Sequence, residues 1–270
     1  FPMASHVVMK PGECSEKGFA DAMPHRSELP SLYNYYARTK SESVQLQALE
    51  DQRCIFFPLF MTGYVIADLL LDNDWFGVKQ VVIGSASSKT GFSTAAFIRA
   101  AGFEGTLVGL TSDQNVAFSE ALGCYDRVVR YVEVESIASE PSTYIDIAGD
   151  VAVRSRLHHS LQSKVAQTLL VGATHWDQFG QSVGGEPLPG SEPQVFFAPA
   201  QIEKRDGEWG RGVMMGKAYA ASIELLSQLA PTLLMESHKG AEACDAIWQS
   251  LLRNQVSGQR GVIMSLPAEA

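Results

Sequence analysis

The sequence predicts an α/β fold built on a doubly wound parallel sheet, and three observations support this prediction. From residue 79 onward, short apolar runs alternate with segments whose apolar residues recur at helical spacing. The runs are mostly apolar along their length, as expected of strands that helices cover on both faces. A cluster of Gly, Ser and Ala follows the first run and leads into a helix, which is the order of a dinucleotide-binding turn.

The elements follow one another in the order that a Rossmann-type sheet requires. Strands are expected at residues 79–83, 106–110, 126–131, 142–147, 165–171 and 195–198, with a last strand at 261–266. Helices are expected at residues 59–71, 89–101, 115–122, 151–161, 213–229 and 241–252. Residues 178–193 are rich in Gly and Pro, so we expect a long loop there.

Composition restricts the class of partner and the compartment. The chain has 270 residues and a formal net charge of -9, which gives no general attraction to nucleic acid or to anionic membranes. No apolar run reaches the roughly 20 residues that span a bilayer, and the four cysteines are scattered, so we expect a reduced, cytoplasmic protein. The chain opens at Phe1 without an initiator Met, and we expect further residues upstream.

Several motifs resemble a known superfamily. The helix that contains Pro58-Leu59-Phe60-Met61-Thr62-Gly63-Tyr64, followed by Gly84-Ser85-Ala86-Ser87-Ser88-Lys89-Thr90-Gly91, resembles the medium-chain dehydrogenase/reductase superfamily, particularly its zinc-free quinone oxidoreductase and enoyl reductase branch. Gly-Cys-Tyr-Asp at 123–126, Gly-Ala-Thr-His-Trp-Asp at 172–177 and Phe-Phe-Ala-Pro-Ala-Gln at 196–201 look more specifically like a divergent, functionally uncharacterised family within it. The broader likeness extends from about residue 55 to 200.

This resemblance implies a division of the chain into three parts. Residues 1–57 would be the later part of a GroES-like catalytic domain, and residues 58–210 a Rossmann-type dinucleotide-binding domain. Residues 211–270 would supply helices and a strand that brace the catalytic domain. The resemblance also implies a homodimer, formed by edge pairing of the sixth strand.

The first strand ends in a variant of the GxGxxG phosphate loop. Its residues are Ser85, Ala86, Ser87, Ser88, Lys89, Thr90 and Gly91, in which Ala86 and Ser88 replace the first two glycines. The start of the following helix offers free amide groups and a partial positive charge to a phosphate. The alternative interpretation is that Ser87 or Ser88 merely caps that helix.

The end of the second strand bears on the choice of cofactor. An NAD-binding protein normally has Asp or Glu there, whereas this chain has Thr111 and Ser112. With Lys89 on the adjacent loop, these hydroxyls would suit a 2'-phosphate, so NADP is preferred to NAD. The alternative is that Thr111 and Ser112 are turn residues and that Lys89 is a solvated helix charge.

The fourth and fifth strands end in further candidates for cofactor binding. These are Ala148 and Gly149 after one strand and Gly172, Ala173 and Thr174 after the other. The carboxyl edge of a doubly wound sheet is where ligands bind. We therefore expect both turns to line the cofactor site.

Catalytic candidates come from two places in the sequence. His175 and Asp177 follow the fifth strand, where His175 could exchange a proton and Asp177 could orient it. A structural role, with Trp176 packed under the following loop, is the alternative. By resemblance, Thr62 would lie near the nicotinamide ribose and Tyr64 near the active cleft, although each such aromatic can also be a core residue.

Other polar residues favour a structural interpretation. His158 and His159 point in different directions on a helix and have no matching cysteines, so a surface feature is expected rather than a metal site. Gln201, Lys204 and Arg205 follow the sixth strand; they could approach the substrate or cofactor, but a solvated charge cluster is the simpler interpretation.

Together these patterns predict a zinc-independent, NADP-linked oxidoreductase that acts on a carbonyl or conjugated double bond of a small molecule. Two alternatives remain open at this level. One is a lyase-type enzyme on the same scaffold without net redox chemistry, and the other is a regulatory protein that binds a dinucleotide without catalysis.

Overall fold

A six-stranded parallel sheet forms the centre of the computed structural model, which describes residues 6–172 and 187–266. The strands lie in the order β6-β5-β4-β7-β8-β9, so the chain enters at β4, moves outward to β6, and then crosses to β7 and out to β9. This is the arrangement of dinucleotide-binding sheets, and it confirms the predicted Rossmann-type fold. The strands are β4 (Gln80–Ile83), β5 (Thr106–Thr111), β6 (Arg127–Arg130), β7 (Ser142–Asp146), β8 (Val165–Leu170) and β9 (Gln194–Val195).

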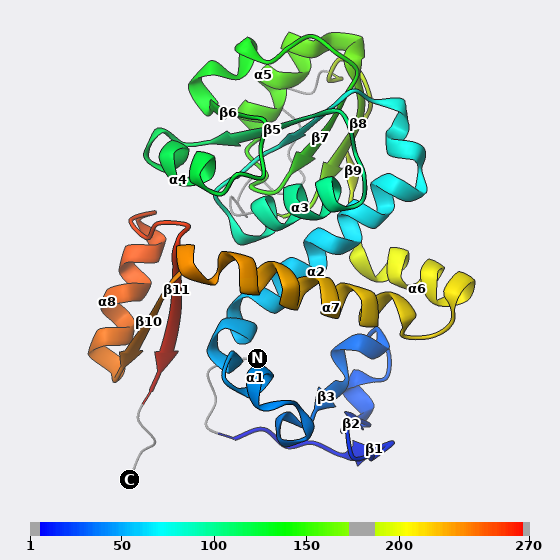
Figure 1. Cartoon of the computed structure of the whole chain (residues 1–270), viewed down its shortest axis with the longest axis vertical. Coiled ribbons are helices and arrows are strands. Elements are labelled where there is room, and N and C mark those ends of the chain that lie inside the picture. The colour runs from blue at the N-terminus through cyan, green and yellow to red at the C-terminus, as the bar shows by residue number, and fades with distance from the viewer. Residues whose placement is uncertain (1–5, 173–186, 267–270) are drawn as a thin grey trace.

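Helices cover both faces of this sheet (Figure 1). On one face, α2 (Glu50–Asp72) and α3 (Lys89–Ala100) pack Phe60 and Phe92 against Ile83. On the other face, α5 (Val151–Leu161) packs Leu157 against Val82. The short α4 (Val116–Ala121) lies beside β6. Because both faces are buried, the strands are apolar along their length, as the sequence predicts.

The helix α2 is longer than the predicted 59–71 and runs through Pro58. The proline removes one backbone donor, and the Thr62 side chain donates a hydrogen bond to the Pro58 carbonyl at 2.9 Å. By length and composition this is the one helix in the described part of the chain that could cross a membrane, which contradicts the expectation that no run is long enough. Half of its most apolar window is buried inside the fold, and α3 and α7 pack along it, as for a core helix.

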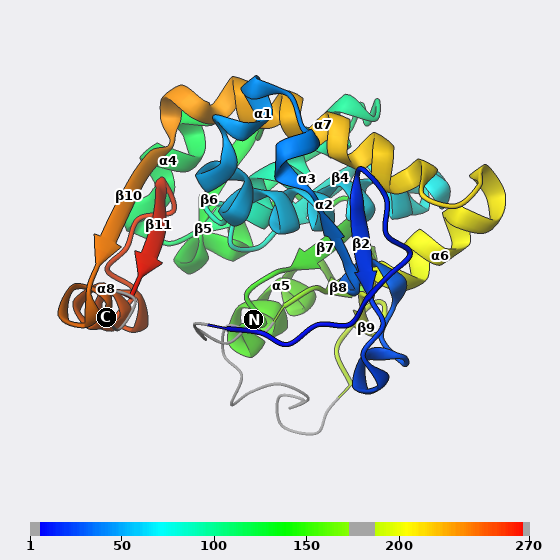
Figure 2. The same cartoon turned by 90° about the horizontal axis from the view of Figure 1, so that it is seen from below.

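Smaller units lie on either side of the α2 and α7 helices (Figure 2). The N-terminal part contains an antiparallel sheet of β1 (Pro11–Gly12), β2 (Gly18–Asp21) and β3 (Tyr35–Ala37), followed by α1 (Val44–Gln47). The C-terminal part contains α7 (Val213–Leu229), β10 (Leu234–Lys239), α8 (Ala241–Leu252) and β11 (Arg260–Ser265), with β10 and β11 parallel. The domain boundary expected between residues 57 and 58 lies inside α2, and the division into three domains stays a prediction.

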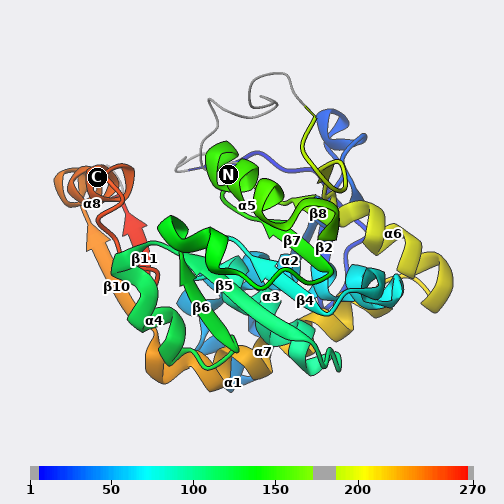
Figure 3. The same ribbon diagram turned by 90° about the horizontal axis from the view of Figure 1, so that it is seen from above.

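Further elements differ from the sequence prediction near the end of the sheet and in the C-terminal part. The sixth strand is only two residues long, because α6 (Ala198–Trp209) begins where the strand was expected to continue, with a proline in its first turn. The strand β10 was not predicted at all. Figure 3 shows α6 and the β10–α8–β11 unit at opposite sides of the molecule. Short 3-10 helices connect the elements at η1 (Pro24–Arg26), η2 (Ser31–Tyr33), η3 (Thr39–Ser41), η4 (Asp74–Gly77), η5 (Asp113–Asn115), η6 (Tyr131–Ser136), η7 (Gln162–Lys164) and η9 (Ala230–Thr232).

His158 is buried, and its prediction as a surface residue is wrong. Its Nδ1 lies 2.7 Å from the Pro189 carbonyl oxygen, and its Nε2 lies 3.0 Å from the Thr168 hydroxyl. A carbonyl can only accept, so Nδ1 carries the proton and Nε2 accepts from Thr168. The ring therefore joins α5, β8 and the chain before β9, while His159 is exposed as expected.

Candidate functional site

The candidate site lies at the carboxyl ends of β4 and β7, where the strand order reverses. The chain leaves β4 toward β5 on one side, whereas β7 lies on the other side, so the loops after β4 and β7 diverge and leave a crevice between them. Residues 84–88 form the loop after β4 and lead into α3. We call residues 84–89 the phosphate loop.

Local hydrogen bonds fix the shape of this loop. Ser85 has a left-handed backbone with φ of 55°, and its carbonyl accepts from the Ser88 amide at 2.8 Å, which closes a tight turn. The Ala86 amide donates to the Leu110 carbonyl at 2.8 Å, which ties the loop to β5. The Ser88 hydroxyl accepts from the Gly91 amide at 3.0 Å and so caps α3.

Gly91 permits a close approach between the loop and α3. A Cβ at this position would lie 2.5 Å from the Ser85 carbonyl oxygen and 3.0 Å from the Ser88 hydroxyl. The Ser85 carbonyl cannot move without opening the turn, and the Ser88 hydroxyl cannot move without breaking the α3 cap. This packing requirement corresponds to the third glycine of a dinucleotide-binding loop.

The loop presents unpaired donors at the start of α3. Of the residues that the structure describes, none accepts a hydrogen bond from the backbone N–H groups of Ser87, Lys89 or Thr90. The helix dipole adds partial positive charge at the same end. These groups fit an anion such as a phosphate.

Two tyrosines hold the loop, and the sequence analysis missed both. The Tyr131 hydroxyl accepts from the Ser85 amide at 3.0 Å, and the Tyr125 hydroxyl donates to the Ala86 carbonyl at 2.9 Å. Burial raises the pKa of both phenols, so they stay protonated at neutral pH. These tyrosines flank β6, some 40 residues from the loop, and no local pattern links them to it.

The hydroxyls at the end of β5 already have partners. The Thr111 hydroxyl donates to the Ser87 hydroxyl at 3.3 Å, and the Ser112 hydroxyl accepts from the Asn115 side-chain amide at 3.0 Å. The charged groups beside them are Asp113 and Arg130, whose closest atoms are 3.9 Å apart. Arg130 also pairs with Glu133, and both of these side chains are about half exposed.

The Lys89 side chain contacts the C-terminal part of the chain. Its ammonium donates to the carbonyl oxygens of Gly258 at 3.0 Å and Arg260 at 2.8 Å, and it lies 5.6 Å from the centre of the Phe56 ring. Burial lowers the pKa of Lys89 to about 8. The alternative of a solvated helix charge is therefore wrong, and the ammonium contacts the C-terminal part of the chain instead of the second-strand end.

A buried carboxylate shapes the turn after β7, and the sequence analysis missed it. Asp146 accepts from the Gly149 amide at 2.8 Å and from the Arg154 guanidinium at 2.7 Å. Its side chain is 1% exposed, and burial raises its pKa against the opposing effect of Arg154. Gly149 has a φ of 72°, which allows the turn that contains Ala148. The sequence did contain a signal for this role, because Asp146 is an acid at the end of an otherwise apolar strand.

The turn after β8 begins at the same edge. A Cβ on Gly172 would lie 2.6 Å from the Ile147 carbonyl oxygen, so Gly172 packs directly on the neighbouring turn. The other candidates of this segment are outside the described residues; they are Ala173, Thr174, His175 and Asp177.

Tyr64 lies about two turns further along α2 than the residue that contacts Lys89 of the phosphate loop. Its ring packs edge-on against Phe97, with centroids 5.5 Å apart. Phe56, eight residues earlier on α2, is the residue that meets Lys89, so Tyr64 is about 12 Å further along the helix. Burial raises the pKa of Tyr64, with Asp68 adding to the shift and Arg205 opposing it. The structure does not bring Tyr64 together with the phosphate loop, and Thr62 donates to its own helix.

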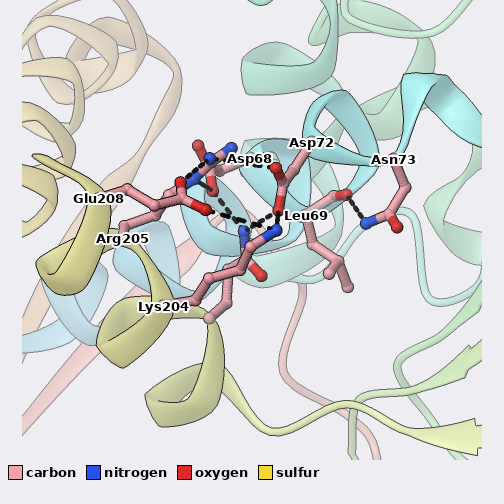
Figure 4. Close-up of polar contacts among 8 residues, drawn as sticks. Asp68, Leu69, Asp72, Asn73, Lys204, Arg205 and Glu208 are labelled. Carbon is pink, nitrogen blue, oxygen red and sulfur yellow. Dashed lines mark hydrogen bonds and ion pairs between the residues drawn. The ribbon is translucent and has the colours of Figure 1, made fainter.

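The polar residues of α6 form a buried cluster with α2 instead of a solvated one (Figure 4). Asp68 accepts from the Arg205 guanidinium at 2.8 Å and from the Gln201 amide at 2.7 Å. Asp72 pairs with both Arg205, at 3.1 Å, and Lys204. Lys204 is half exposed, but Gln201 and Arg205 are buried, so the simple interpretation from the sequence is wrong for these two.

In the described residues, no group of three or more His, Cys, Asp or Glu side chains is placed to hold a metal ion. His175 and Asp177 lie outside the described residues, so this statement does not include them.

Known structures share this fold at low sequence identity. CurK enoyl reductase is 14% identical with a TM-score of 0.50, over 88% of this chain and 67% of CurK. Escherichia coli K-12 YhdH with bound NADPH is 15% identical with a TM-score of 0.45, over 75% of this chain and 61% of YhdH. CurA from Vibrio vulnificus in complex with NADPH is 14% identical with a TM-score of 0.47, over 77% of this chain and 62% of CurA. The chain thus spans about three fifths of the length of YhdH and CurA.

Sequence comparison identifies the family directly. No curated protein matches the chain at a significant level. The profile of the DUF2855 family, described as a protein of unknown function, matches residues 1–257. The chain therefore belongs to the DUF2855 family, on a Rossmann-type fold.

Proposed function

We propose that this protein is an NADP-linked, zinc-independent oxidoreductase that acts on a carbonyl or conjugated double bond of a small molecule. One observation carries the proposal: a phosphate loop with three unpaired backbone donors lies where the strand order of a dinucleotide-binding sheet reverses. The fold shared with an enoyl reductase is consistent with this reaction class.

The residues of the crevice fit a dinucleotide. The amides of Ser87, Lys89 and Thr90 would hold the pyrophosphate at the positive end of α3. Gly149 allows the left-handed turn after β7, and Gly172 packs on the Ile147 carbonyl of that turn; a nicotinamide ribose would pass along this edge. A bound nicotinamide would supply or accept the hydride, and the chain would orient it and the substrate.

The preference for NADP has a different basis from the one that the sequence suggested. No carboxylate ends β5, and Arg130 carries a guanidinium beside Asp113, next to Thr111. Arg fits phosphate groups with paired donors and accommodates 2'-phosphates in such sheets. We therefore assign the 2'-phosphate to Arg130 and not to Lys89, whose ammonium has carbonyl partners.

His175 and Tyr64 are the two candidates for the proton donor. His175 and Asp177 follow Gly172 in sequence, and Gly172 lies at the carboxyl edge. Tyr64 packs on Phe97 and pairs electrostatically with the α2–α6 cluster, which favours a core role for it. We infer that His175, with Asp177, is the first candidate to test.

Calorimetric titration with NADPH and NADH tests the cofactor proposal. Wild-type protein is expected to bind NADPH about tenfold more tightly than NADH, and Arg130→Gln should remove that difference. Arg127→Gln is the matched control, because Arg127 lies on the same strand and its guanidinium donates to Ser136. Equal affinities in the wild type would contradict the NADP assignment, and absence of any binding at millimolar cofactor would contradict the whole proposal.

Turnover tests the reaction class. We expect oxidation of NADPH with a member of a panel of quinones, enones and aldehydes, and no loss of rate after treatment with EDTA. His175→Gln should lower kcat by about 100-fold without a comparable loss of cofactor affinity. Loss of activity on chelation would refute zinc independence.

A homodimer that pairs through the edge of β9 is part of the proposal. Val195 on this edge strand is 67% exposed. Light scattering after size exclusion checks the mass, and Val195→Lys is expected to shift the dimer to a monomer.

A further inference from the structure

Hydrogen bonds join the C-terminal part of the chain to Lys89 of the phosphate loop and to Gln114 of η5. Residues 254–260 follow α8 and end at the first residue of β11, and we call them the C-terminal strap. The Lys89 ammonium donates to the strap carbonyls of Gly258 and Arg260 at 3.0 and 2.8 Å. The Gln114 side-chain amide approaches the Asn254 carbonyl at 3.5 Å.

Gly258 packs closely against the backbone of the phosphate loop. A Cβ on this residue would lie 2.2 Å from the carbonyl oxygen of Ser87 and 3.3 Å from the ring of Phe118. The strap backbone therefore lies directly on the phosphate loop and on α4. Because the obstructing atom at Ser87 is backbone, any larger residue would push the strap and the loop apart.

Lys89 is suited to hold two segments that are far apart in sequence. Its side chain leaves the first turn of α3, passes the Phe56 ring of α2, and ends on the strap, some 170 residues away. An ammonium donates up to three hydrogen bonds and accepts none, and two of its donors end on strap carbonyls. A charged donor gives a stronger bond than a neutral one would.

We propose that Lys89 is a positioning residue that fastens the C-terminal strap onto the phosphate loop, so that the strap forms a wall of the dinucleotide site. This inference rests on the proposed dinucleotide function. Lys89 and Ser87 present their backbone N–H groups to the anion site, while the Lys89 side chain and the Ser87 carbonyl contact the strap. Cofactor binding and strap attachment are thus linked, and each strengthens the other.

Hydrogen exchange of the strap amides tests the fastening without any cofactor. In Lys89→Met the alkyl stem is kept and the donor is lost, so residues 254–260 should exchange about tenfold faster than in the wild type. Lys89→Arg should recover most of the protection, because a guanidinium can reach the same carbonyls. Gly258→Ala should speed exchange as Lys89→Met does, through the contact with Ser87.

Lys164→Met is the matched control, since Lys164 is exposed in the turn before β8. It should leave the exchange of the strap unchanged. Circular dichroism confirms that each variant is folded. Unchanged exchange in both Lys89→Met and Gly258→Ala would overturn the fastening.

Titration with NADPH and NADH then tests the linkage. Lys89→Met should weaken both dinucleotides by the same factor, about fivefold or more, because the lysine acts through the strap and not on the 2'-phosphate. A selective loss of NADPH would overturn the inference and show that Lys89 contacts that phosphate. Unchanged affinities would refute the linkage. If wild-type protein binds neither dinucleotide, the proposed function and the linkage both fail, and the exchange comparison alone decides the fastening.

Discussion

Replacing Arg205 by methionine is expected to lower the free energy of unfolding by about 3 kcal/mol. The side chain of Arg205 is 9% exposed and that of its partner Asp68 is 7% exposed, so their charges face little solvent. In the variant, Asp68 keeps only the hydrogen bond from the Gln201 amide. The cost arises because a buried carboxylate is left without a cation, not because the original pair is strong in itself.

Urea denaturation followed by far-ultraviolet circular dichroism measures this loss. For a chain of this size we expect the midpoint to fall by about 1 M urea, with the slope unchanged. The double variant Asp68→Asn with Arg205→Met should recover a large part of the loss, because it removes the stranded charge as well as its partner.

Arg130→Met is the matched control for this experiment. Arg130 also forms ion pairs, but its side chain is 44% exposed and that of Glu133 is 45% exposed. Solvent screens such pairs, so no measurable change in stability is expected. If Arg205→Met shifts the midpoint no more than Arg130→Met does, or if the double variant is less stable than the single one, the burial argument for the α2–α6 cluster is wrong.

Three further predictions concern the loop, its tyrosine and the buried histidine. Ser88→Ala should destabilise the protein by about 1 kcal/mol through loss of the α3 cap, whereas Ser88→Gly should cost only a few tenths; equal losses in urea titrations would contradict the capping role. Tyr131→Phe leaves the Ser85 amide without its acceptor, so dinucleotide affinity by calorimetry should fall about tenfold; an unchanged value would refute this support. Burial lowers the pKa of His158, so the folded state resists protonation of this ring. The free energy of unfolding should therefore decline as the pH falls below about 6.5. Unfolding measured as a function of pH should show a shallower decline for a His158→Gln variant.

The fold could be predicted because its signal is local and repeated. Each apolar strand of the central sheet, and each amphipathic helix that covers it, can be recognised from about ten consecutive residues. Prediction failed where one residue outweighed the pattern. The helix expected at residues 59–71 begins earlier, with Glu50 and Asp51 in its first turn, and runs through Pro58. Phe197 and Ala198 extended an apolar run, although Pro199 opens a helix there.

The candidate site also has one part that the sequence predicts and one part that it does not. Ser85 to Gly91 could be identified because the loop and its helix are contiguous in sequence. Tyr125, Tyr131 and the strap reach the loop through tertiary contacts over sequence separations that no local pattern spans. Lys89 shows the consequence: a cation beside a phosphate loop suggested a phosphate ligand, but its long side chain turns toward carbonyls of a distant segment.

These contacts explain how the loop can have Ser88 in place of the central glycine. In a GxGxxG loop that glycine allows the pyrophosphate to approach bare backbone. Here the Ser88 hydroxyl turns back onto the Gly91 amide and caps the helix, so it does not point into the approach path of an anion. The amides of Ser87, Lys89 and Thr90 stay unpaired beside it. A serine is therefore compatible with phosphate binding as long as it serves as the cap, and Ser88→Gly should leave dinucleotide affinity nearly unchanged. A large loss of affinity in that variant, with stability preserved, would show instead that the hydroxyl is itself a ligand.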